Sequence, residues 1–279
     1  GARGNAGVFG GVTQSLRDKG VSPVNTTDGP SGIRLYDSCS LLPMGTLLAS
    51  TFDLELVEGL YRAMGAEMRW RGSDVLLAPG MNIHRNPLCG RNFEYFSEDP
   101  YLTGRIAGAV VKGLQSQGVS ACVKHFACNN QELNRNRCDS VVSERALREI
   151  YLKGFEICLK QAKPLTLMTS YNRVNGIWSH YNYDLVQTIA REEWGYEGMV
   201  MTDWWMQYAA SPEFPKVTGN GYRVRGRVNV LMPGSRKFQD HSDKPDKTLL
   251  ATYGKKNGIT LGELQENAKY VLNCVMKLK

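Results

Sequence analysis

The chain has 279 residues, a length that suits one large α/β barrel or two smaller domains. Hydrophobic residues make up 42% of it and charged residues 22%, which excludes a disordered or collagen-like chain. No apolar run approaches the roughly 18 residues needed to cross a membrane. The net charge of +7 is spread along the chain, apart from the stretch 222–227, and this indicates a solvated surface with no nucleic-acid partner.

The cysteines predict free thiols. No C-x-x-C pair and no histidine at zinc spacing accompanies them, and the first residues show no secretory pattern. We therefore expect reduced, mostly buried cysteines and a cytoplasmic location. The seven positions are Cys39, Cys89, Cys122, Cys128, Cys138, Cys158 and Cys274.

Short apolar runs recur along the chain and predict strands. Near-continuous runs of four to six residues are typical of parallel strands that are buried on both faces. A weaker seventh run lies at 47–50, and an eighth strand is expected before the first residue. The six clear runs are 24–27, 74–78, 121–126, 165–170, 198–202 and 228–232.

Amphipathic helices are predicted between these runs: one opened by Asp53, one over 102–114, one after an N-cap at Ser143, and one over 261–275. Strands that alternate with helices indicate a parallel sheet, doubly wound or closed into a barrel. No G-x-G-x-x-G follows a strand, and the loops after the strands are long and polar. The expected fold is therefore α/β, a TIM-like (β/α)8 barrel that is incomplete at its N-terminal end.

Two polar segments, 211–221 and 235–258, carry no helical pattern and are expected to be mobile surface loops. Pro212 and Pro215 also predict that any helix in the segment 206–230 is short or distorted. The barrel wall beside Asp203 is then expected to be looser than in a regular barrel.

Polar side chains follow the predicted strands, where a parallel barrel places its active site. Carboxylates and basic groups of this kind hydrogen-bond the hydroxyls of a sugar, and an aromatic face packs against its C–H groups. No phosphate cradle and no metal triad occurs among them, so neither a cofactor nor a metal is implied. The candidates are Asp28, Arg91, Lys124, His125, Met168, Tyr171, Asp203 and Trp204.

Each candidate also has a structural interpretation. Asp28 opens an Asp-Gly-Pro sequence that is common in turns. Arg91 could pair with Glu94 or Glu98 and fix a loop, and Asp203 could cap a following helix. Their joint position at successive strand ends favours a site.

The chain resembles the barrel domain of family-3 glycoside hydrolases, the β-glucosidase family. The resemblance covers most of 28–205 and continues more weakly through VLMPGS and the final helix. The opening GNAGVFGG is similar to members in which the domain order is reversed. The matching stretches are TDGPSGIR, LLAPGMNIHRNPLCGRNFEYFSEDPYLTG, ACVKHFACNNQE, SERALREIYLKGFE, MTSYNRVNG and EEWGYEGMVMTDWW.

The resemblance implies a role for each candidate. Asp203, in a Thr-Asp-Trp motif, matches the catalytic nucleophile, and Asp28 matches the aspartate that binds the distal hydroxyls of the glucose. Tyr171 matches the tyrosine beside the nucleophile, and Met168 lies on the same strand. Three basic residues match those that hold the ring hydroxyls, namely Arg91, Lys124 and His125. Trp204 matches the aromatic residue at the wall of the site.

The general acid has no clear match. In larger family members it is a glutamate from a separate α/β domain, and we expect residues 1–279 to be the barrel domain without that partner. Some shorter members use an Asp-His pair, but here Ser140 follows Asp139. Three glutamates are substitutes by residue type only: Glu94, Glu98 and Glu132.

The resemblance thus implies a retaining β-glucosidase that removes terminal β-linked glucose from an oligosaccharide or aryl glucoside through a covalent intermediate on Asp203. The alternatives are a sugar-binding barrel with impaired catalysis, or a β-xylosidase or N-acetylglucosaminidase of the same family. The expected partners are the sugar substrate and the missing α/β domain. The sequence leaves open whether the chain forms a homo-oligomer.

Overall fold

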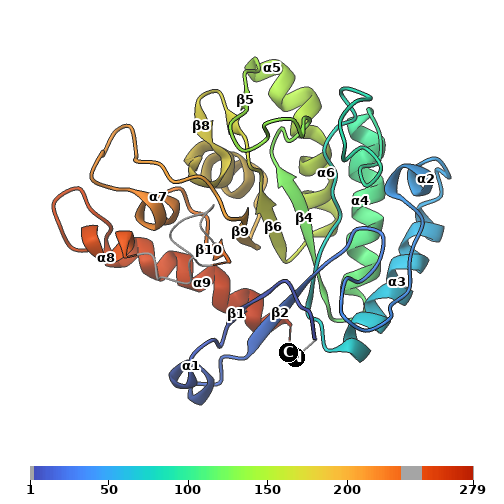
Figure 1. Cartoon of the computed structure of the whole chain (residues 1–279), viewed down its shortest axis with the longest axis horizontal. Helices are drawn as coiled ribbons and strands as arrows, with labels where there is room; N and C mark the ends of the chain where they lie inside the picture. Colours follow the sequence, from blue (N-terminus) through green and yellow to red (C-terminus); the bar gives the residue numbers. More distant parts are fainter. Residues whose placement is uncertain (1–2, 234–246, 279) are drawn as a thin grey trace.

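The computed structural model describes residues 3–233 and 247–278. Its centre is a seven-stranded sheet in the order β1-β2-β3-β4-β6-β9-β10 (Figure 1). Neighbouring strands from β2 to β10 are parallel, whereas β1 is antiparallel to β2. The strands are β1 (Gly7–Gly10), β2 (Pro23–Asp28), β3 (Val75–Leu77), β4 (Ser120–Phe126), β6 (Thr166–Thr169), β9 (Met199–Trp204) and β10 (Val230–Met232).

The six clear strands predicted from the sequence are therefore confirmed as β2, β3, β4, β6, β9 and β10. Their residues alternate between two cores. On β3, Val75 and Leu77 belong to a core enclosed by the strands, whereas Leu76 packs against the outer helices. On β9, Met199 and Met201 face inward and Val200 faces outward. A sheet buried on both faces explains the near-continuous apolar runs.

The two end strands of the sheet approach one another, so the sheet is nearly closed into a barrel. A Cβ atom on Gly7 of β1 would lie 2.7 Å from the methyl carbon of Met232 on β10, which shows how near the two strands are. The indole Nε1 of Trp204 donates to the carbonyl of Ala6 at 3.3 Å. Cys274 and Val275 of the last helix complete the inner core.

Helices cover the outside of the sheet. Figure 1 shows α3, α4 and α6 along one side and α7, α8 and α9 at the other end. The helices are α1 (Gln14–Asp18), α2 (Gly45–Ala49), α3 (Leu54–Arg71), α4 (Pro100–Gln115), α5 (Glu144–Ala146), η1 (Leu147–Tyr151), α6 (Lys153–Ala162), η2 (Ser179–Tyr181), η3 (Asp184–Glu193), α7 (Gly219–Arg225), α8 (Thr248–Thr252) and α9 (Leu261–Lys277). A small second sheet combines β5 (Asp139–Ser140), β7 (Arg173–Val174) and β8 (Ile177–Trp178).

The four predicted helices are confirmed, and their start signals act as expected. Asp53 caps α3 by accepting from the backbone N–H of Leu56 at 2.9 Å. Ser143 caps α5, which continues through η1 into α6. Thr260 and Glu263 form a reciprocal capping box at the start of α9.

The predicted strand at 47–50 is wrong, because this segment forms α2. Leu48 and Ala49 are both buried, whereas Leu47 is 57% exposed. The backbone N–H groups of Leu48 and Ser50 donate to the carbonyls four residues earlier, Met44 and Thr46, at 3.0 and 3.1 Å, as in a helix. The seventh strand is instead β1, whose short Gly-Val-Phe-Gly sequence carries little strand signal.

The segment after β9 differs from the expected surface loop. Val217 is buried against Val224 and Ile259, and a helix of only seven residues, α7, begins at Gly219. That helix is short, as the prolines predicted. The expectation for 235–258 falls partly on residues outside the described ranges; its last part contains α8.

The arginines of the basic stretch 222–227 form ion pairs and hydrogen bonds with other parts of the chain. Arg225 pairs with Glu263 at 3.0 Å, and Arg227 pairs with Glu266 at 3.1 Å, both on α9. The guanidinium of Arg223 donates to the carbonyl of Val228. These charges therefore join α7 to α9.

All seven cysteines are free, and five of them are buried. In the described ranges no helix is both long enough and apolar enough to cross a membrane.

Candidate active site

A cavity of about 690 Å³ opens at the carboxyl ends of β2, β4, β6 and β9. Parallel strands end at the same edge of a sheet, and this brings together side chains that are distant in the sequence. All eight sequence-predicted candidates line this cavity: Asp28, Arg91, Lys124, His125, Met168, Tyr171, Asp203 and Trp204.

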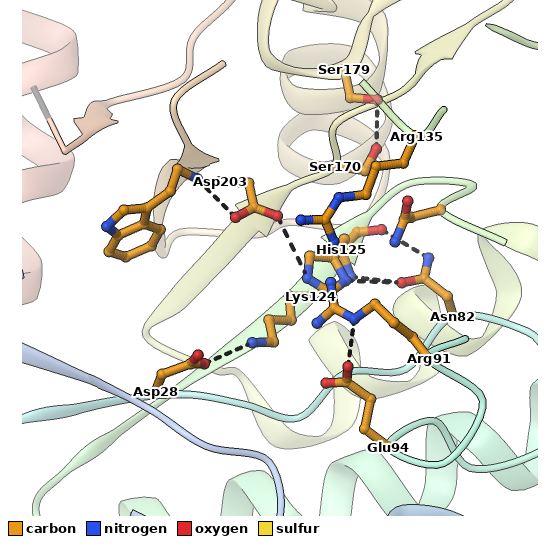
Figure 2. Close-up of polar contacts among 12 residues, drawn as sticks. Asp28, Asn82, Arg91, Glu94, Lys124, His125, Arg135, Ser170, Ser179 and Asp203 are labelled. Carbon is orange, nitrogen blue, oxygen red and sulfur yellow. Dashed lines mark hydrogen bonds and ion pairs between the residues drawn. The ribbon is translucent and has the colours of Figure 1, made fainter. Parts of the chain in front are cut away.

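Asp203 is the penultimate residue of β9, and its side chain is almost completely buried. Its Oδ1 accepts a hydrogen bond of 2.7 Å from the backbone N–H of Trp204, and its Oδ2 lies 3.6 Å from Nε2 of His125 (Figure 2). No helix begins directly after Asp203, since the next one is α7. The carboxylate therefore faces the cavity and caps no helix.

The pKa of Asp203 is raised. Burial is the largest cause, because it disfavours the charged carboxylate. The positive charges of Arg91, Lys124 and Arg135 act in the opposite direction. The sequence predicted the effect of the first two cations, but burial outweighs them.

Arg91 is held by an ion pair with Glu94, as the structural interpretation of this residue allowed. Its guanidinium also lies 5.8 Å from the centre of the Tyr95 ring. Because the side chain of Glu94 is 5% exposed, the ion pair is shielded from water. The pairing orients Arg91 into the cavity, so the structural and the binding interpretations are both compatible with this geometry.

Asp28 and Lys124 form a second pair across the cavity, with Nζ 3.2 Å from Oδ1. Burial alone would raise the pKa of Asp28, but the charge and hydrogen bond of Lys124 outweigh it, and the pKa is lowered. Arg34 approaches the other oxygen of Asp28 at 3.7 Å. Asp28 is therefore a stable anion, and it is not only a turn residue.

His125 is fixed by its neighbours. Asn82 accepts from its backbone N–H and donates to its carbonyl, both at 2.9 Å, and the hydroxyl of Tyr95 lies 3.2 Å from Nδ1. Burial, and then the charges of Arg91 and Lys124, hold the pKa of His125 well below its usual range. The imidazole is therefore neutral at pH 7, so its contact with Asp203 is no ion pair.

The remaining candidates form walls of the cavity. Met168 lies on β6 and belongs to the inner core. The hydroxyl of Tyr171 has a raised pKa, mainly because of burial and then because of the negative charge of Asp203. Trp204 is anchored through its indole N–H to Ala6.

The sequence interpretation missed four further polar or aromatic residues that line the cavity. Arg135 stacks over the ring of Tyr171 at 4.3 Å and pairs with Glu132 at 2.8 Å. Residues 134–137 read Asn-Arg-Asn-Arg, and no strand end marks which of the two arginines points inward; Arg137 is exposed. The missed residues are Arg34, Tyr36, Arg135 and Trp205.

Among the described residues, no group of three or more His, Cys, Asp or Glu side chains is arranged to hold a metal ion. The chemistry available in the cavity is therefore that of one buried carboxylate, one paired carboxylate, several cations, a neutral imidazole and aromatic walls.

Known proteins share this sequence and fold. Residues 12–232 match the model of the glycosyl hydrolase family 3 N-terminal domain. A β-glucosidase of Ruminococcus albus is 45% identical over 275 residues, which are 98% of this chain and 28% of that protein. An exo-α-(1→6)-L-arabinopyranosidase of Bifidobacterium breve is 46% identical over 235 residues, covering 80% of this chain and 30% of the relative.

A solved β-glucosidase structure from Paenibacillus barengoltzii superposes with a TM-score of 0.88 at 45% identity, covering 99% of this chain and 31% of that protein. The chain thus spans about a third or less of the length of these relatives. It belongs to glycosyl hydrolase family 3 and carries that family's N-terminal domain.

Proposed function

We propose that this chain is the nucleophile-bearing domain of a retaining β-glucosidase, with Asp203 as the nucleophile. The observation that carries the proposal is the position of Asp203: a buried carboxylate at the end of β9, facing a cavity that also presents Arg91, Lys124 and Arg135. We also propose that the nearly closed sheet is a variant of the (β/α)8 barrel.

In a retaining mechanism one carboxylate attacks the anomeric carbon, the bond from that carbon to the leaving-group oxygen breaks, and a glycosyl–enzyme ester forms. A partly desolvated Asp203 suits this role, because an anion with few water contacts has less hydration to lose when it attacks. The three cations favour the ionised form, because their charges oppose the rise in the pKa that burial causes. Water then attacks the anomeric carbon from the face that the leaving group has left, the bond to Asp203 breaks, and the sugar is released with its original anomeric configuration.

The other candidates suit the recognition of a pyranose. The Asp28 carboxylate accepts hydrogen bonds from two hydroxyls, and Lys124 donates to one. Nδ1 of the neutral imidazole of His125 faces the hydroxyl of Tyr95, so Nε2 is the ring nitrogen that is available to a sugar hydroxyl. Trp204 presents an aromatic ring to the C–H groups, and Met168 supplies an apolar floor.

A general acid is needed for natural substrates, and the cavity does not supply a good one. In the described part of the chain, the carboxyl side chains that line the cavity are Asp28 and Asp203. The lowered pKa of Asp28 keeps it ionised, so it has no proton to donate. Glu94 and Glu132 are engaged with arginines. We therefore propose that a carboxyl group from a second domain completes the site.

The sugar is proposed to be a terminal β-linked glucose, since several relatives are named β-glucosidases. The arabinopyranosidase relative shows that enzymes with other names occur at the same level of identity. A panel of dinitrophenyl glycosides (glucoside, xyloside, N-acetylglucosaminide and α-L-arabinopyranoside) identifies the sugar by the highest kcat/KM.

Covalent labelling tests the proposal. After incubation with 2,4-dinitrophenyl 2-deoxy-2-fluoro-β-glucoside, mass spectrometry should locate a fluoroglucosyl adduct on the peptide that contains Asp203. The matched control, Asp203→Asn, should remain unlabelled. An adduct on Glu94 or Glu132 would overturn the assignment. Glucose binding by calorimetry without any labelling would instead support a sugar-binding barrel with impaired catalysis.

A further inference from the structure

The short turn η2 (Ser179–Tyr181) contacts both the loop that carries Tyr171, after β6, and the loop that follows Asp203, after β9. It comes directly after the small hairpin β7–β8. Its first residue, Ser179, is hydrogen-bonded to the residues that follow β6. Ser179 accepts a hydrogen bond of 2.8 Å from the hydroxyl of Ser170 and donates one of 2.9 Å to the carbonyl of Asn172 (Figure 2 shows the contact with Ser170).

These partners of Ser179 flank Tyr171 in the sequence. The hydroxyl of Ser170 also lies 2.8 Å from the carbonyl oxygen of Ala127, which is a second acceptor for its single proton, and both Ser170 and Asn172 are buried. The first residue of η2 therefore has a defined position relative to the loop of Tyr171.

The next two residues of η2 reach the loop that follows Asp203. The backbone carbonyl of Gln207 accepts two hydrogen bonds, one from Nε2 of His180 at 2.9 Å and one from the hydroxyl of Tyr181 at 3.0 Å. Gln207 lies in a stretch with no regular secondary structure, two residues after Trp205. Trp204 and Trp205 both line the cavity, so the contact at Gln207 restrains the wall directly after the proposed nucleophile.

Aromatic packing makes this contact rigid. The rings of His180 and Tyr181 lie 4.1 Å apart, and the ring of Tyr181 stacks on Tyr222 of α7 at 4.5 Å with an interplanar angle of 10°. Gly226 permits the close approach, because a Cβ atom there would lie 2.8 Å from the carbonyl oxygen of Tyr181. The turn is therefore held by both strand-end loops and by α7.

The hydrogen bond from His180 to Gln207 leaves the other ring nitrogen of His180 without a partner in the described part of the chain. A carbonyl oxygen only accepts, so Nε2 must carry the ring proton and Nδ1 is left unprotonated. Nδ1 is buried, and no described residue hydrogen-bonds to it. An apolar ring of similar size would avoid this unsatisfied nitrogen, but it would not hydrogen-bond the Gln207 carbonyl. Burial also lowers the pKa of His180 to about 3, and the imidazole remains neutral at working pH.

We propose that η2 is a positioning element of the site, in which His180 and Tyr181 hold the Gln207 carbonyl and thereby fix Asp203 and Trp205 relative to Tyr171. This inference rests on the proposed function, because it assigns to His180 and Tyr181 an effect on the reaction of Asp203. Both residues act through the loop and are not expected to touch the sugar.

Four variants of the 279-residue chain test the proposal. His180→Phe keeps a ring but removes the donor, and Tyr181→Phe removes the other donor. His180→Gln places a side-chain amide near the position of Nε2 and should restore the bond. The control is Tyr196→Phe, since the hydroxyl of Tyr196 also donates to a backbone carbonyl, that of Met199, at the opposite end of β9.

Kinetics with dinitrophenyl β-glucoside give the first result. His180→Phe and Tyr181→Phe should each lower kcat about tenfold, because small displacements of a reacting group have large effects on rate. KM should change less than twofold, His180→Gln should recover most of the loss, and Tyr196→Phe should resemble wild type. A wild-type kcat in both His180→Phe and Tyr181→Phe would overturn the proposal.

Amide hydrogen exchange gives a second result that does not require activity. Peptides covering 204–210 should exchange faster in His180→Phe and Tyr181→Phe than in wild type, while the exchange of residues 199–203 of β9 should be unchanged in all four variants. If the wild-type chain is inactive, the proposed function fails, and the exchange result still decides whether η2 restrains the loop. Unchanged exchange at 204–210 would overturn the restraint.

Discussion

Nζ of Lys124 lies 3.2 Å from Oδ1 of Asp28, and this ion pair joins β2 to β4 across the intervening strand β3. The side chain of Lys124 is only 6% exposed, whereas that of Asp28 is 39% exposed. The carboxylate of Asp28 therefore neutralises the buried ammonium group of Lys124 and is also available to accept hydrogen bonds from a bound sugar.

Replacing Asp28 should thus affect both stability and binding. Asp28→Asn should abolish glucose binding by calorimetry and lower the thermal midpoint at pH 7, because Lys124 loses its counter-ion. The pKa of Asp28 is lowered by folding, so its stabilising contribution is present above the ordinary value of 3.8 and disappears as the pH falls through the folded pKa. The midpoints of the two proteins should converge on acidification. Equal midpoints at pH 7 would contradict the prediction.

Asp203→Asn should have the opposite effect on stability. The raised pKa means that the ionised carboxylate is disfavoured in the folded protein. The neutral amide should therefore raise the thermal midpoint at pH 7 by about 2–4 °C, the shift that about 1 kcal/mol produces in a domain of this size. The gain should decrease as the pH falls toward 3.8 and Asp203 becomes protonated in wild type. A lower midpoint for Asp203→Asn at pH 7 would show that the carboxylate is structurally required. Calorimetric scans between pH 4 and pH 8 measure the difference in thermal midpoint and its dependence on pH.

Arg135 should control the acid limb of the pH–rate profile. Its charge lowers the pKa of Asp203, so Arg135→Gln should raise that pKa and move the acid limb to higher pH. The rate with dinitrophenyl glucoside should also fall, because the stacking on Tyr171 is lost. Arg137→Gln is the matched control, since Arg137 is exposed two residues further on. An unchanged acid limb in Arg135→Gln would exclude a direct electrostatic effect.

The leaving group should decide how well the isolated chain works. General acid catalysis contributes roughly 10²–10⁴-fold in rate, and a dinitrophenolate leaves without a proton whereas the sugar alcohol of cellobiose does not. The chain alone should therefore hydrolyse dinitrophenyl glucoside far better than cellobiose, by a larger ratio of kcat/KM than intact relatives show. A ratio equal to that of the relatives would mean that a carboxyl group within this chain acts as the acid.

Two glycines test the packing of the outer helices. A Cβ atom on Gly113 of α4 would lie 2.5 Å from the carbonyl oxygen of Glu58 on α3, whereas Gly59 has open space around it. Gly113→Ala should lower the free energy of unfolding by about 1–3 kcal/mol through overpacking. Gly59→Ala should raise it by up to about 1 kcal/mol through helix propensity. Urea denaturation of both variants provides the comparison, and equal effects would contradict the interhelical contact.

The sequence determined the types of most elements and the convergence of the site. Apolar runs and helical stripes report burial directly, so six strands and four helices could be predicted from them. Asp28 and Asp203 could be placed in one cavity because parallel strands share a carboxyl edge, whatever their separation along the chain. Neither inference needs atomic distances.

Tertiary structure decided the features that depend on distances and solvent. The segment 47–50 forms helical hydrogen bonds and packs one side of α2 on the core, and β1 joined the sheet through partners that its glycine-rich sequence does not specify. Arg135 entered the cavity through the path of a loop. The direction of the pKa of Asp203 followed from burial outweighing three nearby cations, a balance between desolvation and Coulomb attraction that is set by the spatial arrangement of the side chains.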